Sequence, residues 1–272
     1  MSGIDTPHAA SLDRLEAVLN RQSPVDAIAA LTQAVQKAPK PSVSLNEVAL
    51  GFDASVFLRL ATEKRSVEIL DYLIQHAAPL VIPGQAIQEF WNNQLNVVDT
   101  VGTTLRKRFD SLAVEAKKID SRFGDFEDEV LKMLERFQRQ FGYIYDENVG
   151  DSVTRMLEIL QSKSCCSFVP RDRFICAAQI RNSTRTPPGF KDAGDGDFYV
   201  WADFLFGLLV HESEPGGQNF KQVVLLTNDR KADWSTHGMP HPILTAEVRT
   251  LFDVPFDVWD LEKFGSEVRK SL

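Results

Sequence analysis

The sequence predicts an α/β fold with three layers, in which helices cover both faces of a central parallel sheet. Short apolar runs, such as Val48–Leu58 and Gln222–Thr227, suit strands that are buried on both faces. These runs alternate with segments of helical periodicity, as in proteins built from strand–helix–strand units. A long stretch of purely helical pattern interrupts the alternation and is predicted to be an insertion.

Composition and charge agree with a globular protein and exclude several classes. The chain has 272 residues, of which 43% are hydrophobic and 25% are charged, as is usual for soluble domains. No apolar run is long enough to cross a membrane, and the first residues do not resemble a signal peptide. We therefore expect a cytoplasmic protein without a membrane partner.

The first 44 residues are predicted to form an N-terminal helical extension. Leu12, Leu15, Val18 and Leu19 have the spacing of one helix face. A second helix is expected to begin with Ser23 as N-cap and Pro24 at the first helical position, and to run to about Ala34.

Residues 45–94 are interpreted as the first half of the α/β domain. The run Val48–Leu58 is predicted to be a buried strand with Asp53 near its carboxyl end. A helix is expected at 63–75, with Val67, Leu70 and Ile74 on one face, followed by a strand at 79–83 and a helix at 85–93.

Residues 95–164 are interpreted as a helical insertion. Apolar residues recur at spacings of three and four on both sides of a turn at Gly124 and Asp125, which predicts an antiparallel helical hairpin, and a third helix is expected at 152–161. The alternative is a coiled coil. These helical regions could therefore form a homodimer or bind a partner protein.

Residues 165–272 are interpreted as the second half of the α/β domain. The stretch 171–191 holds five basic residues and one acid between its ends and is interpreted as a solvated loop. A helix is expected at 198–210, a strand at 222–227 that runs directly into Asn228 and Asp229, and a last strand at 256–259.

Carboxylates are concentrated where these strands end. Asp53 and Asp229 each follow a strand, and ligands bind in α/β sheets beyond the carboxyl ends of the strands. Glu89 lies on the polar face of the helix after the second strand, with Gln85 and Asn93 four residues away on either side. Clustered carboxylates repel one another unless a cation lies between them, and oxygen ligands favour Mg²⁺ or Mn²⁺. The net charge of −8 is compatible with such a site.

Several segments resemble PIN domains, and among them the larger PIN-like group with a helical insertion. The resemblance extends from Val48 to Phe264. It is carried by the segments Phe52–Phe57, Ile82–Asn93, Pro187–Asp192, Gly196–Trp201, Leu226–Trp234 and His241–Glu247.

The resemblance implies a three-layer α/β/α PIN-like domain that binds Mg²⁺ or Mn²⁺ and hydrolyses phosphodiester bonds, most often in RNA. The implied catalytic residues are Asp53, Glu89, Asp197 and Asp229. Each is also an implied metal ligand, together with Asp192; Asp192, Asp195 and Asp197 compete for the third ligand position.

Other residues have supporting roles in this interpretation. Asn93, Thr227, Asn228 and Asp233 would hold the carboxylates or the scissile phosphate in place. Arg185, Lys191 and Arg230 would bind nucleic-acid phosphates.

Two other functions remain open. A PIN-like scaffold without catalysis could bind RNA or protein. Another α/β metal phosphohydrolase is the second alternative, although Asp53-Ala54-Ser55 lacks the D-x-D pattern of haloacid-dehalogenase-like enzymes, and no phosphate-binding glycine motif is found.

Overall fold

The computed structural model describes most of the chain, and the central sheet lies within the described part. The described residues are 8–36, 43–60, 66–97, 100–118, 125–141, 148–191, 194–217, 220–229 and 231–271. They form two compact units, one made of Met1–Phe90 with Glu158–Leu272 and the other of Trp91–Leu157.

The first unit contains a five-stranded parallel sheet with strand order β3-β2-β1-β4-β7. Its strands are β1 (Val48–Phe52), β2 (Leu80–Pro83), β3 (Ser164–Ser167), β4 (Gln222–Leu226) and β7 (Phe256–Trp259). A separate two-stranded antiparallel pair consists of β5 (Ser235–Thr236) and β6 (Met239–Pro240). The α/β class with a parallel sheet is thus confirmed.

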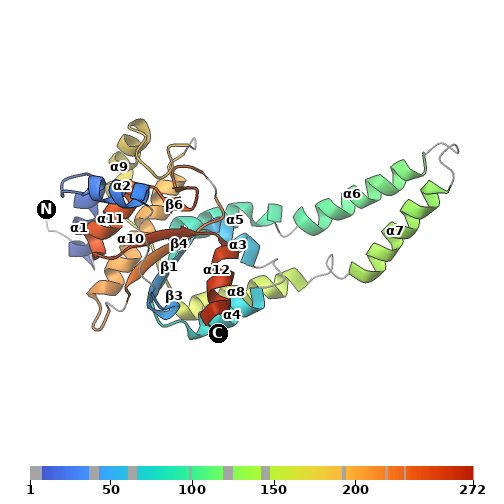
Figure 1. Ribbon diagram of the computed structural model, residues 1–272, viewed down its shortest axis with the longest axis horizontal. Coiled ribbons are helices and arrows are strands. Elements are labelled where there is room, and N and C mark those ends of the chain that lie inside the picture. The colour runs from blue at the N-terminus through green and yellow to red at the C-terminus, as the bar shows by residue number, and fades with distance from the viewer. Residues whose placement is uncertain are drawn as a thin grey trace. The chain divides into compact units, whose positions relative to one another are not determined.

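Helices cover both faces of the sheet (Figure 1). One layer holds α10 (Gly196–Ser213) and α11 (Pro242–Phe252), against which α1 (Ala9–Leu19) and α2 (Ala27–Gln36) pack. The other layer holds α3 (Ala54–Leu60), α4 (Ser66–Gln75) and α12 (Leu261–Ser271). Short helix η1 (Leu45–Glu47) precedes β1, and α5 (Gly84–Val97) and α9 (Arg171–Ser183) follow β2 and β3.

Apolar side chains on β1, β2, β4 and β7 and on α10 form the core of this unit. Every residue of β1, β2, β4 and β7 is buried, as expected for parallel strands covered on both faces. Gly51 in β1 allows Phe204 of α10 to approach, because a Cβ atom there would lie 2.5 Å from the Phe204 ring.

The second unit contains α6 (Thr100–Ala116), α7 (Phe126–Phe141) and most of α8 (Asn148–Lys163). Within it, α6 and α7 contact each other and run in opposite directions (Figure 1). The predicted turn at Gly124 lies outside the described residues.

Several expected boundaries were wrong. The apolar run after Val48 is a strand only as far as Phe52 and continues as α3, because the Asp53 carboxylate accepts the Ala54 N–H and turns the chain. The second helix begins at Ala27 and not at Pro24, because Asp26 Oδ1 accepts the Ala29 N–H at 2.9 Å and so provides the N-cap.

The expected face of α4 was also wrong in part. Leu70 is buried, whereas Val67 and Ile74 are exposed. The buried face consists of Ile69, Leu70, Tyr72 and Leu73.

The basic stretch 171–191 is not a solvated loop, because most of it forms α9 and three of its arginines, Arg171, Arg173 and Arg181, are paired with acids. Arg171 binds both carboxylate oxygens of Asp203 at 2.8 and 2.9 Å. Arg173 pairs with Asp13 and Glu16 of α1. These contacts fix α9 to α10 and to the N-terminal helix.

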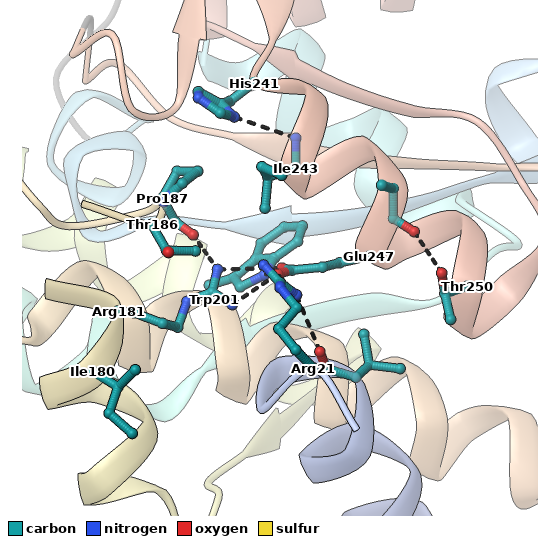
Figure 2. A network of polar contacts seen from close by, with 12 residues as sticks. Arg21, Ile180, Arg181, Thr186, Pro187, Trp201, His241, Ile243, Glu247 and Thr250 are labelled. Carbon is teal, nitrogen blue, oxygen red and sulfur yellow. Dashed lines mark hydrogen bonds and ion pairs between the residues drawn. The ribbon is translucent and has the colours of Figure 1, made fainter. Parts of the chain in front are cut away.

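A buried carboxylate joins the N-terminal segment to α9, α10 and α11 (Figure 2). Glu247 of α11 is fully buried and accepts from Arg181 at 2.7 and 3.3 Å and from Trp201 Nε1 at 2.7 Å. Arg21, two residues after the end of α1, pairs with the same carboxylate at 2.7 Å. The predicted N-terminal extension is therefore part of the first unit.

Candidate functional site

Asp53 lies directly after β1, at the carboxyl edge of the sheet, and is held by three donors. Its Oδ1 accepts the Ala54 N–H at 2.7 Å. Its Oδ2 accepts the hydroxyls of Ser55 at 2.6 Å and Thr227 at 2.7 Å. Thr227 is in reach because Phe52 pairs with Leu226 in the parallel register, so that the next residue of each strand lies at the same edge.

The Thr227 hydroxyl connects Asp53 to Asp229. It donates to Asp53 and accepts the backbone N–H of Asp229 at 3.0 Å. Asp229 Oδ1 in turn accepts the backbone N–H of Lys231 at 3.1 Å, which closes a turn typical of aspartate.

A lysine ammonium lies between the carboxylates of Asp229 and Asp197. Lys231 Nζ is 2.7 Å from Asp229 Oδ2 and 3.4 Å from Asp197 Oδ2. Asp197 belongs to the first turn of α10, whereas Asp229 follows β4. Two carboxylates from separate elements therefore share one positive charge, which offsets their mutual repulsion.

Glu89 lies against the start of α10. Its Oε1 accepts from Gln85 Nε2 at 3.0 Å, one helix turn earlier in α5. A Cβ atom placed on Gly196 would lie 2.6 Å from the same Oε1. Since Gly196 immediately precedes Asp197, glycine at this position leaves room for the Glu89 carboxylate beside Asp197.

The structure thus brings Asp53, Glu89, Asp197 and Asp229 to one edge of the sheet. Asp53 reaches Asp229 through Thr227, Asp229 reaches Asp197 through Lys231, and Glu89 lies beside Gly196.

Two of the expected supporting residues have structural contacts. The Asn228 side chain donates to the Ser55 carbonyl and accepts the Leu261 N–H, both at 3.3 Å. Asp233 is fully buried and accepts the Gly189 N–H at 3.0 Å. A Cβ atom placed on Gly189 would lie 3.2 Å from the Cβ atom of Asp197, so Asp233 supports the loop beside that residue.

The other expected residues lie at the surface or outside the described part. Asp195 precedes α10, and its side chain makes no capping hydrogen bond. Arg185 and Lys191 are exposed. Asp192, Arg230 and the side chain of Asn93 lie outside the described residues.

Two site residues were missed by the sequence analysis. Ser55 donates to Asp53 and accepts the Asn228 N–H at 3.0 Å, and Lys231 joins the two carboxylates. The signal available for each was its position two residues after a strand-end aspartate.

The donor chemistry of this site fits a hard divalent cation. All four acids offer oxygen ligands, which suit Mg²⁺ or Mn²⁺, and an ammonium already lies between two of them. Among the described residues, however, no three His, Cys, Asp or Glu side chains are close enough to hold a metal ion together. The cation-binding arrangement in this structure is therefore a pair of carboxylates around Lys231.

Histidine does not contribute to this site. Burial lowers the pKa of His241 below its ordinary value, although Asp233 and Glu247 oppose this shift. His241 Nδ1 accepts the Ile243 N–H at 3.2 Å and caps α11 (Figure 2). The role of His241 is thus structural.

Comparison of the chain with protein families, curated proteins and solved structures found no match. None of the helices in the described residues combines the length and apolar character needed to span a bilayer.

Proposed function

We propose that the protein is a metal-dependent nuclease of the PIN-like class that hydrolyses phosphodiester bonds, with RNA as substrate and the cytoplasm as its location. The observation that supports this most is the single cation position shared by Asp197 and Asp229, with Lys231 Nζ at 3.4 and 2.7 Å. Asp53 is linked to the backbone of Asp229 through Thr227, and Glu89 lies beside Gly196 at the start of α10.

The four acids would have different roles, because their surroundings differ. Asp197 and Asp229 would bind the cation directly, since an ammonium already occupies the space between them. Asp53 would keep its position through the hydroxyls of Ser55 and Thr227, and Glu89 would approach from α5 beside Gly196. A bound Mg²⁺ or Mn²⁺ would supply activation of water and neutralisation of the phosphate charge.

Positive charge near this edge would bind the substrate backbone. Arg185 and Lys191 are exposed in the structure, and Arg230 follows Asp229 directly in the sequence. Guanidinium and ammonium groups bind phosphates without regard to base sequence. The helical regions would remain available for a second copy or a partner protein.

One observation favours the alternative of a non-catalytic scaffold. Lys231 already neutralises part of the charge of the Asp197–Asp229 pair, as it would in a protein that never binds metal. The same arrangement is compatible with a metal enzyme in its metal-free state, so an activity assay must decide between the two.

The test uses two aspartates at the start of the same helix. Labelled single-stranded RNA, single-stranded DNA and duplexes are incubated with wild type, Asp197→Asn and Asp195→Asn, in Mn²⁺ or in EDTA. We expect cleavage of RNA that requires Mn²⁺. Asp197→Asn should lower the rate by more than about 100-fold, beyond the usual effect of a residue that only supports a ligand. Asp195→Asn should cleave at nearly the wild-type rate.

Two results would contradict the proposal. If wild type cleaved none of these polymers in Mn²⁺, the scaffold alternative would be favoured. If Asp197→Asn retained full activity, Asp197 would not be a metal ligand.

A further inference from the structure

The hairpin of α6 and α7 buries few of its own side chains. Among the side chains of these two helices that the structure describes, only Ala116 is buried. Leu112 of α6 is 39% exposed, and Phe126 and Met133 of α7 are 50% and 49% exposed. Helices are stabilised mainly by the packing of an apolar face. The hairpin therefore has apolar surface that its two helices alone do not cover.

The three exposed apolar residues lie on one side of the hairpin. In each helix the apolar residue four positions later, Ala116 after Leu112 and Val130 after Phe126, lies about 40° further round the helix and is less exposed. Met133 is two turns after Phe126 on the same edge of α7. Because α6 and α7 run in opposite directions (Figure 1), these two matching edges point to the same side. We call the surface formed by Leu112, Phe126 and Met133 the hairpin face.

Charged residues flank the hairpin face in a regular order. In α6, Arg108 lies one turn before Leu112 and Glu115 lies one turn after it. In α7 the order is reversed, with Glu129 one turn before the exposed methionine and Arg136 one turn after it. All four charged residues are exposed. Both glutamates thus lie towards the end where α6 stops and α7 starts, the tip, and both arginines lie towards the other end, the base.

We infer that the hairpin face binds the same face of a second copy of this chain, tip to base, so that four helices form an antiparallel bundle. A two-fold axis across the face would pair each helix with its own counterpart. Arg108 would then lie opposite Glu115 of the partner subunit, and Glu129 opposite Arg136 of the partner subunit. With the two tips side by side, arginine would face arginine and glutamate would face glutamate. This inference does not depend on the proposed nuclease activity.

The apolar contact is tested by sedimentation equilibrium of the full chain from about 1 to 100 μM. We expect wild type to form a dimer. Leu112→Lys should raise the dissociation constant by about 100-fold or more, because the two-fold axis would bring two ammonium groups into an apolar contact. Val114→Lys is the control, since Val114 is 55% exposed but lies on the opposite side of α6. Its dissociation constant should match that of wild type, and circular dichroism checks the helix content of each variant.

The charged residues test the orientation of the two copies. Arg136→Glu would bring like charges together at two symmetric positions and should raise the dissociation constant by about tenfold. This difference from wild type should shrink at high salt. The double variant Glu129→Arg/Arg136→Glu restores opposite charges across the interface, so it should dimerise nearly as tightly as wild type.

Three results would overturn the inference. A wild-type monomer at every concentration would leave the hairpin face to a different protein. Equal weakening of the dimer by Leu112→Lys and Val114→Lys would mean that the copies meet elsewhere. A tighter dimer of Arg136→Glu would mean that the tips lie side by side.

Discussion

Hydroxyl groups determine how Asp53 is presented at the sheet edge. Its Oδ2 accepts from both Ser55 and Thr227, and Thr227 also accepts the N–H of Asp229. These contacts fix the position of the Asp53 carboxylate. The Thr227 hydroxyl thus links the carboxylate of Asp53 to the backbone of Asp229.

The residue scale also shows what a sequence can predict about a site. Asp53 and Asp229 could be placed at one edge because consecutive strand ends of a parallel sheet meet there. Lys231 could not be placed, because a lysine at the protein surface has the same sequence pattern as one that reaches between two carboxylates. Its role depends on its contact with Asp197 at the start of α10, which is a tertiary contact.

Gly196 provides a prediction at this scale. In Gly196→Ala the new Cβ would lie 2.6 Å from Glu89 Oε1, so the flexible carboxylate must move away from Asp197. We expect RNA cleavage to fall by about 10–100-fold, as for other changes that misplace a ligand. The free energy of unfolding should change by less than about 1 kcal/mol.

Gly194→Ala is the matched control, since nothing lies within 4 Å of a Cβ atom at that position. Its cleavage rate and unfolding midpoint should match those of wild type. Equal rates for the two variants would show that Glu89 does not act from this position.

At the scale of elements, the segments with a clear apolar pattern were predictable and the polar ones were not. The strands at 79–83, 222–227 and 256–259 were expected within a residue or two of their observed ends. The β3 strand was missed because Ser-Cys-Cys-Ser has neither β-branched residues nor alternation.

The α9 helix was missed for a different reason. Its charged and apolar residues are not segregated on opposite faces, because Arg171, Arg173 and Arg181 pair with acids on other elements. Such pairs are invisible in a local pattern, which therefore resembled a solvated loop.

The ion pairs of Glu247 with Arg181 and Arg21 yield a prediction about stability. Glu247→Met would leave the guanidinium of Arg181, whose side chain is 4% exposed, without its carboxylate. Loss of one partner of a buried ion pair costs about 3–5 kcal/mol, so the free energy of unfolding in urea should fall by that amount.

Arg21→Met is the comparison, because it leaves Glu247 paired with Arg181 and Trp201. The Arg21 side chain is 37% exposed, and its loss should cost about 1 kcal/mol or less. Similar small losses for both variants would mean that this network does not hold the N-terminal helix in place.

At the scale of the whole molecule, the α/β class followed from strand and helix alternation, whereas the proposed function depends on a proposed metal site that alternation does not reveal. The sheet positions acids from β1, α5, α10 and the loop after β4 at one edge. The helical unit Trp91–Leu157 is a separate compact part of the chain.

The most direct test of the proposed metal site is the anomalous diffraction of crystals that contain Mn²⁺. We predict a peak within coordination distance, about 2 Å, of carboxylate oxygens of Asp197 and Asp229. The absence of any peak at these residues at saturating Mn²⁺ would contradict the proposed metal site.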